Sequence, residues 1–247
     1  MLTRNAITLL AAGSLALLAA GCGSSGSKSS STATGTPVLY SPTVVPAQFT
    51  TEITNQYFPL KPGTVYTYAG TEDGVSQGNV VTVTHDTKVV DGVTCVVVHD
   101  VVTENNEVIE DTFDWYAQDT AGNVWYFGED TKTYEKSTPT GTKGSWEAGV
   151  NGAQPGIVME AVPKQGDSYR QEYLAGEAED QARVAQLGGT RNVPAGSYQQ
   201  VLSTIEYSAL EPNMLEQKDY APGVGFVYGV LTRGGNEEVQ LVKVTTD

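Results

Sequence analysis

Residues 79–103 read NVVTVTHDTKVVDGVTCVVVHDVVT, and this stretch decides the fold class. Two runs rich in valine and threonine flank Asp91-Gly92, a dipeptide that strongly indicates a two-residue turn between antiparallel strands. The turn pairs Val90 with Val93 and so sets the register of the whole hairpin. The second run, 93–101, is apolar on both faces, and we therefore expect this strand to lie centrally in a sheet that is covered on both sides.

Period-two alternation continues along the chain, interrupted at short intervals by turn residues, which is typical of all-β proteins. Residues 177–187 fit either one short helix or a strand, and the surrounding pattern favours a strand. Residues 137–164 have no clear period and are long for a loop, which indicates a lid, a binding loop or regular structure that the pattern does not reveal. The fold class is all-β: a single antiparallel, strongly curved sheet or incomplete barrel. Besides the hairpin, strands are predicted at 64–69, 107–116, 123–127, 132–136, 168–174, 198–208, 225–231 and 238–245.

Composition excludes several functions. The 247 residues include 14 Lys and Arg against 29 Asp and Glu, a formal charge of −15, and so acidic a chain repels nucleic acid. Two cysteines cannot build a disulfide framework or a four-thiolate zinc site. Residues 74–78 match G-x-S-x-G, but a strand follows directly, where a hydrolase elbow needs a helix. We assign no catalytic, cofactor-binding or metal-binding residue and expect no cofactor.

The first 21 residues have the pattern of an export signal. Arg4 precedes an apolar stretch, 6–20, that is short for a membrane-spanning helix and suits a signal peptide. The run Leu18-Ala19-Ala20-Gly21-Cys22 resembles the lipobox of bacterial lipoproteins, although the commonest residue at the position of Ala19 is leucine. The resemblance implies cleavage before Cys22 and lipidation of that cysteine. A plain secretory signal and an uncleaved anchor are the alternatives.

The residues after the signal divide into a tether and a body. Residues 22–42 begin with the candidate lipidated cysteine and continue in Gly, Ser and Thr, a composition that predicts flexible coil. No Gly- or Pro-rich linker interrupts 43–247, so this region is predicted to be a single β-rich domain. The acidic body would be repelled by anionic headgroups, so the lipid is the expected membrane contact.

The two histidines fall within the predicted hairpin on opposite faces. Counting outward from the turn makes His85 the diagonal neighbour of Asp100 and His99 that of Asp86, at roughly 7–8 Å. Such a pair is either an imidazole base oriented by a carboxylate or a satisfied polar contact within the sheet. Since the faces differ, the histidines cannot share a metal ion. Asp111 interrupts an apolar stripe, and Arg170, Arg183 or Lys164 are its candidate partners.

Aromatic residues gather on two neighbouring predicted strands. Trp115, Trp125 and Tyr126 either line a pocket for an apolar or sugar ligand or belong to the core. The runs 114–119, 122–129, 144–149, 169–173 and 220–225 resemble uncharacterised exported bacterial proteins that are β-rich. The resemblance implies an exported β protein and no activity, and Cys22 is the one functional residue that it and the lipobox supply.

Together these observations predict a cell-envelope lipoprotein with a binding or structural role rather than catalysis. It would be exported and lipid-anchored, on the outer face of the bacterial membrane or in the periplasm. Two alternatives stay open: a carrier of a lipid or other apolar ligand, and an envelope-polymer hydrolase using carboxylates or a His–Asp pair. An interaction module using an exposed sheet edge is a third. The ligand or protein partner is not identified by the sequence.

Overall fold

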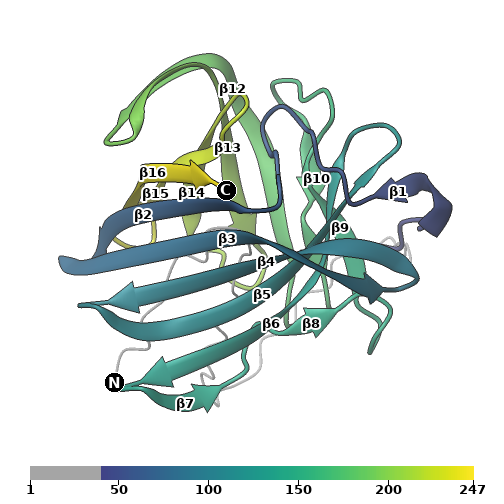
Figure 1. The fold of residues 1–247 in the computed structure, drawn as a ribbon, viewed down its shortest axis with the longest axis horizontal. Helices are drawn as coiled ribbons and strands as arrows, with labels where there is room; N and C mark the ends of the chain where they lie inside the picture. The colour runs from purple at the N-terminus through teal and green to yellow at the C-terminus, as the bar shows by residue number, and fades with distance from the viewer. Residues whose placement is uncertain (1–39) are drawn as a thin grey trace, which may run out of the picture.

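The computed structural model describes residues 40–247, and these residues form an all-β fold, as predicted (Figure 1). The one helical segment among them is a 3₁₀ turn, Pro46–Gln48. The predicted signal peptide, Cys22 and most of the predicted tether lie outside the described residues. The strands are β1 (Phe49–Thr50), β2 (Thr64–Glu72), β3 (Val75–Val90), β4 (Val93–Glu104), β5 (Glu107–Asp119), β6 (Val124–Glu135), β7 (Thr138–Gly141), β8 (Trp146–Glu147), β9 (Gln154–Met159), β10 (Ser168–Arg170), β11 (Glu172–Tyr173), β12 (Asp180–Val193), β13 (Gly196–Ser208), β14 (Leu215–Ala221), β15 (Gly225–Arg233) and β16 (Glu237–Thr246).

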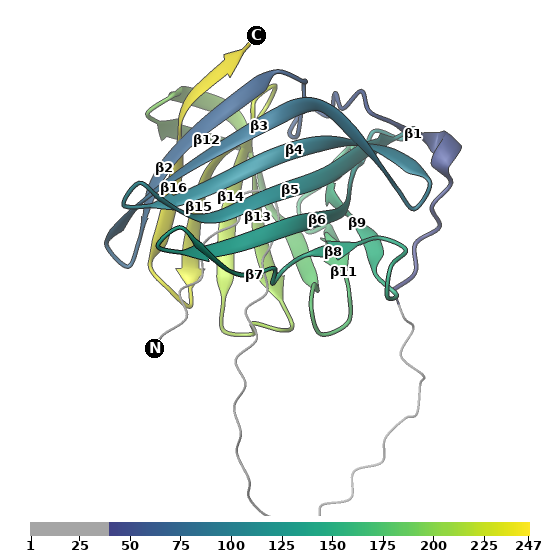
Figure 2. The ribbon, with the colours of Figure 1, turned by 60° about the horizontal axis from the view of Figure 1, so that its bottom comes forward.

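All strands belong to one antiparallel sheet in the order β10-β12-β13-β14-β15-β16-β2-β3-β4-β5-β6-β9-β11, with β1, β7 and β8 paired at its side. The sheet curls until it nearly closes, with β2–β6 across one wall and β12–β15 behind them (Figure 2). The seam falls between the two ends of this order. There, residues 168–173 act as a bridge, because β10 pairs with β12 while β11, directly after it, pairs with β9.

The hairpin that decided the fold class is present, with one irregularity. Val90 pairs with Val93, and Asp91 and Gly92 have φ of 47° and 78°, the left-handed values such a turn requires. The register holds to Thr87 and then shifts by a bulge of residues 84–86. There the Thr84 hydroxyl donates to the carbonyl of Val97 (2.7 Å) instead of continuing the ladder.

Three other segments can be compared with the secondary structure predicted from the sequence. Strand β12 covers most of 177–187, so the preference for a strand there is confirmed. Of the alternatives for residues 137–164, unrecognised regular structure is the one found, because the region contains β7, β8 and β9. Strand β14 was not predicted, since its inward positions carry charged residues.

Residues 53–60 cross one end of the curled sheet. The Asn55 amide donates to the carbonyls of Gly122 and Glu160 on one side, and the Gly223 amide donates to the carbonyl of Gln56 on the other. Shortly after these attached residues in the sequence, the Phe58 side chain enters the interior. It lies 5.6 Å from the ring of Tyr116 and 6.3 Å from that of Tyr220, centroid to centroid. This end is therefore filled by apolar side chains, and the polar interior lies beyond it.

Candidate functional site

The interior carries a layer of buried acids. Asp100 on β4, Asp114 on β5 and Glu129 on β6 are 1%, 0% and 4% exposed, and we call these three residues the inner carboxylate group. They share a face because Asp114 pairs directly with Glu129, while Asp100 pairs with Thr112, two residues before Asp114. Three adjacent strands thus place three acids side by side in the interior.

Tyr126 joins two members of this group. Its hydroxyl oxygen is 2.8 Å from Asp114 Oδ1 and 2.7 Å from Glu129 Oε2. A phenol has one hydrogen and can donate to only one of them, so the other contact is a hydrogen bond only if that carboxyl is protonated. The electrostatics agree: burial raises the pKa of Glu129 to about 8 and, with Glu129 nearby, raises the pKa of Asp114 well above its usual range.

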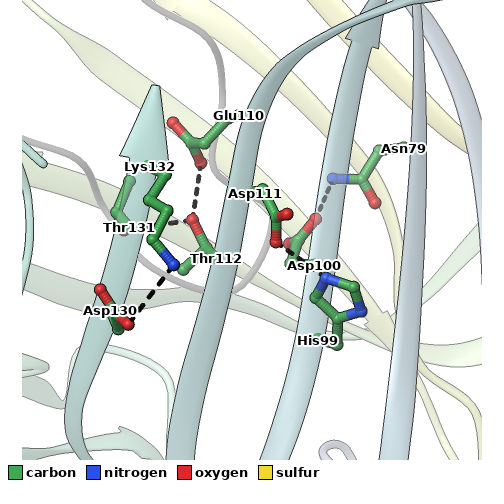
Figure 3. Close-up of polar contacts among 9 residues, drawn as sticks. All are labelled: Asn79, His99, Asp100, Glu110, Asp111, Thr112, Asp130, Thr131 and Lys132. Atoms are coloured by element: carbon green, nitrogen blue, oxygen red, sulfur yellow. Dashed lines mark hydrogen bonds and ion pairs between the residues drawn. The ribbon is translucent and has the colours of Figure 1, made fainter. Parts of the chain in front are cut away.

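Asp100 is held from one side only. The Asn79 amide donates to its Oδ1 at 2.6 Å (Figure 3), while its Oδ2 has no hydrogen-bond partner. Burial raises the pKa of Asp100 well above its usual range, and the neighbouring Asp114 raises it further. Asp114 Oδ2 likewise lacks a partner. A buried polar atom without a partner is costly, and it commonly marks a place for water, an ion or a ligand.

A second cluster on the opposite wall contains its own cation. Lys218 Nζ lies 2.9 Å from Glu206 Oε2 and 3.4 Å from Glu216 Oε2. Thr204 and Tyr220 donate to Glu206 Oε1 at 3.0 and 3.1 Å. Burial lowers the pKa of Lys218, but Glu206 and Glu216 raise it by more, so the ammonium group stays charged. Lys218 is the one lysine or arginine buried among residues 40–247.

The two clusters differ in charge balance. Lys218 offsets the acids of its own wall, whereas no ion pair with the inner carboxylate group is found in the described part of the chain. The inner group is therefore uncompensated unless protons or a bound cation neutralise it. No group of three or more His, Cys, Asp or Glu side chains within 40–247 is placed to hold a metal ion.

The predicted histidine pairs do not form. His99 Nε2 lies 2.8 Å from Asp111 Oδ1 on the next strand, and its ring stacks on Phe113 at 4.3 Å (Figure 3). His85 is in the bulge and 73% exposed, and its Nε2 is 4.0 Å from Asp247 Oδ1. Asp86 is exposed in the same bulge. The bulge turns both His85 and Asp86 outward. Asp111 is paired with His99 and not with any of the basic residues that the sequence suggested as its partners.

The three candidate pocket aromatics lie in different places. Trp115 is buried under Lys88, whose Nζ sits 3.3 Å from the ring centroid. Trp125 is half-buried and its indole N–H donates to Asp119 Oδ2 at 2.8 Å. Only Tyr126 reaches the interior, so these residues do not line a common pocket. Cys95 is a buried free thiol whose pKa burial raises to about 12, which suits a core residue.

Of the inner carboxylate group, only Asp100 was singled out from the sequence, as the diagonal neighbour of His85. Asp114 and Glu129 each lie close to other acidic residues in the sequence and do not stand out from them, and Lys218 carries no local signal. The signal that could have revealed this group is a charged residue at an inward position of an alternating strand. Recognising it requires the register of three strands to be known.

No protein-family model and no curated protein matches the chain. Two solved structures are similar in fold. One is a protein from Bacteroides fragilis described as exported, with a YmcC-like fold: TM-score 0.47, 14% identity, 77% of this chain and 99% of that chain covered. The other is from Parabacteroides distasonis and is described as a lipoprotein: TM-score 0.42, 12% identity, with the same coverage. Within residues 40–247, no helix has the length and apolar character needed to cross a membrane.

Proposed function

We propose that the chain is a lipid-anchored protein of the bacterial cell envelope whose β domain binds a polar ligand inside the curled sheet. The placement is supported by the lipobox-like run that ends at Cys22. The binding role is supported by one observation: Asp100 and Asp114 each direct a partnerless carboxylate oxygen into a fully buried interior. A sheet that served only as a spacer would gain nothing from these groups, because their burial costs stability.

The buried acids of the interior argue against a lipid or other apolar ligand. A lipid tail would have to lie against Asp100, Asp114 and Glu129 and would leave their oxygens unsolvated. Acyl chains need apolar walls, and here the apolar side of the interior is already filled by Phe58.

A hydrolase is the second candidate, because Asp114 and Glu129 bond to the same hydroxyl and so lie close together. Paired carboxyls, one protonated and one ionised, are the groups that glycoside hydrolysis uses. Both side chains are buried behind the wall of the sheet, which favours binding over turnover of a polymer. Release of reducing sugar from cell-wall polysaccharide by the wild type, lost in Glu129→Gln, would favour this candidate.

Two measurements test the proposal. Radiolabelled palmitate should enter the wild type and not Cys22→Ser, and the variant should leave the membrane fraction. Native mass spectrometry of the purified protein should show a polar adduct that is lost on denaturation. A protein that takes no label contradicts the placement, and a body that holds only a phospholipid contradicts the binding role.

A further inference from the structure

We propose that the inner carboxylate group binds the ammonium group of a small organic amine, which replaces a proton shared within the group. This inference rests on the proposed binding role and names its ligand class. Its starting point is the charge imbalance: Asp100, Asp114 and Glu129 are buried together, while the lysine of the interior is committed to Glu206 and Glu216.

The partnerless oxygens give the ligand its acceptors. Asp100 Oδ2 and Asp114 Oδ2 belong to side chains that are at least nine-tenths buried and have no hydrogen-bond partner. They lie on adjacent strands at diagonal positions of the same face. An ammonium group carries several donors, and charge-assisted bonds to two carboxylates would satisfy both oxygens at once.

Aromatic rings border the same place. Tyr116 and Tyr126 stack at 4.9 Å between centroids, and Trp146 meets Tyr126 edge-on at 5.2 Å. Faces of aromatic rings beside carboxylates form the setting in which proteins hold organic ammonium ions. A metal ion lacks this preference, and the described residues contain no metal-binding arrangement.

The protein already holds one ammonium group in this manner. Lys218 Nζ sits between two carboxylates, with the Tyr220 hydroxyl bonded to one of them. On the other wall, Asp114, Glu129 and Tyr126 repeat that set of groups without the lysine. The inner carboxylate group therefore has the chemistry of an ammonium site whose cation must come from outside.

The end of the sheet opposite residues 53–60 suits the entry of a cation. The turns there lie at 73–74, 105–106, 209–214 and 234–236. Half-buried Glu104, Glu110 and Glu211 stand at this end, and their charge would raise the local concentration of cations. The opposite end is closed by Phe58 and its neighbours.

Proton displacement follows from the Tyr126 geometry. In the free protein the Asp114–Tyr126–Glu129 contacts need a proton on one carboxyl, and binding of an ammonium ion to the ionised pair releases it. The charged and titratable groups facing this pair are Asp100, Glu110, Tyr116, Glu172 and, at longer range, Lys218. Most are acidic, so they favour both the stored proton and the incoming cation. The affinity should therefore rise between pH 6 and pH 8.

The test is isothermal titration of the full chain with methylammonium, putrescine and spermidine chlorides at pH 8, with sodium chloride at matched ionic strength. At least one amine should bind saturably at one site. In buffers of different ionisation enthalpy, the heats should show release of a proton. Asp114→Asn should weaken binding at least tenfold, and Asp111→Asn, on the same strand but the outer face, should leave it unchanged.

Asp100→Asn provides the same test should Asp114→Asn fail to fold. The inference is overturned if no amine binds above the sodium control, or if both Asn variants bind like the wild type. Failure of every amine while native mass spectrometry shows another polar adduct overturns this inference and leaves the proposed function intact. Absence of both removes the proposed function as well.

Discussion

Lys218 Nζ lies 2.9 Å from Glu206 Oε2 with only 3% and 5% of the two side chains exposed. Removing one partner of a buried ion pair leaves an uncompensated charge, which costs about 3–5 kcal/mol. We therefore expect Lys218→Met to lower the free energy of unfolding, measured by urea titration, by this amount. Lys132→Met is the matched control, because Lys132 Nζ is 3.9 Å from Asp130 and 46% exposed, and its loss should cost less than about 1 kcal/mol. Equal losses would show that Lys218 is not buried in an ion pair.

Stability should fall as pH rises. Burial raises the pKa of Glu129 and of Asp180 to about 8 and that of Glu216 to about 7, so the folded protein holds protons that the unfolded chain releases near pH 4. Stability from these groups is complete below that pH and is lost as pH rises through 7 and 8. The melting temperature should be higher at pH 5 than at pH 9, and Glu129→Gln should flatten the curve. A melting temperature that rises across this range would contradict the buried, protonated state.

The two histidines should respond differently to replacement. His99 is bonded to Asp111 and stacked on Phe113, and His99→Ala should cost about 1 kcal/mol of unfolding free energy. His85 is 73% exposed, so His85→Ala should change stability by less than about 0.5 kcal/mol. A double-mutant cycle with Asp111→Asn isolates the contact. Coupling of His85 to Asp100 in such a cycle would instead support the register predicted from the turn alone.

Gly128 should tolerate a side chain far less than another glycine with positive φ, Gly74. Its φ is 126°, and a Cβ there would lie 2.2 Å from the carbonyl oxygen of Trp146 on β8. Gly74 has φ of 82° and nothing within 4 Å of the added atom. Gly74→Ala should cost about 1 kcal/mol from backbone strain, while Gly128→Ala should displace β8 and lower the melting temperature much further. Equal effects would mean that strain alone matters at both positions.

The fold class could be predicted because its signals are local. Asp91-Gly92 and the valine runs beside it specify a hairpin without reference to the rest of the chain. The bulge at 84–86 could not be predicted from the sequence, because apolar and polar residues alternate in the same way before and after it. Its effect was large, since it turned His85 and Asp86 outward and invalidated both predicted pairs.

The candidate site was harder to predict because it reverses the usual pattern. Strand β14 places Glu216, Lys218 and Tyr220 inward. A prediction that expects the buried residues of a strand to be apolar therefore misses it. Likewise, Asp114 is one acid among several on β5 until the registers of three strands show it facing Glu129. Charge inside a curled sheet is a property of the assembled wall rather than of any single segment.

Within residues 168–173, β10 pairs with β12 and β11 pairs with β9, so the two ends of the sheet are strands of only three and two residues. A long bare strand at the edge of a sheet is a template on which other copies of a chain can pair and aggregate. Residues 168–173 cover that template at Gln181–Arg183 of β12 and at Gln154–Pro155 of β9, and these positions are closed to pairing with a second copy of this chain.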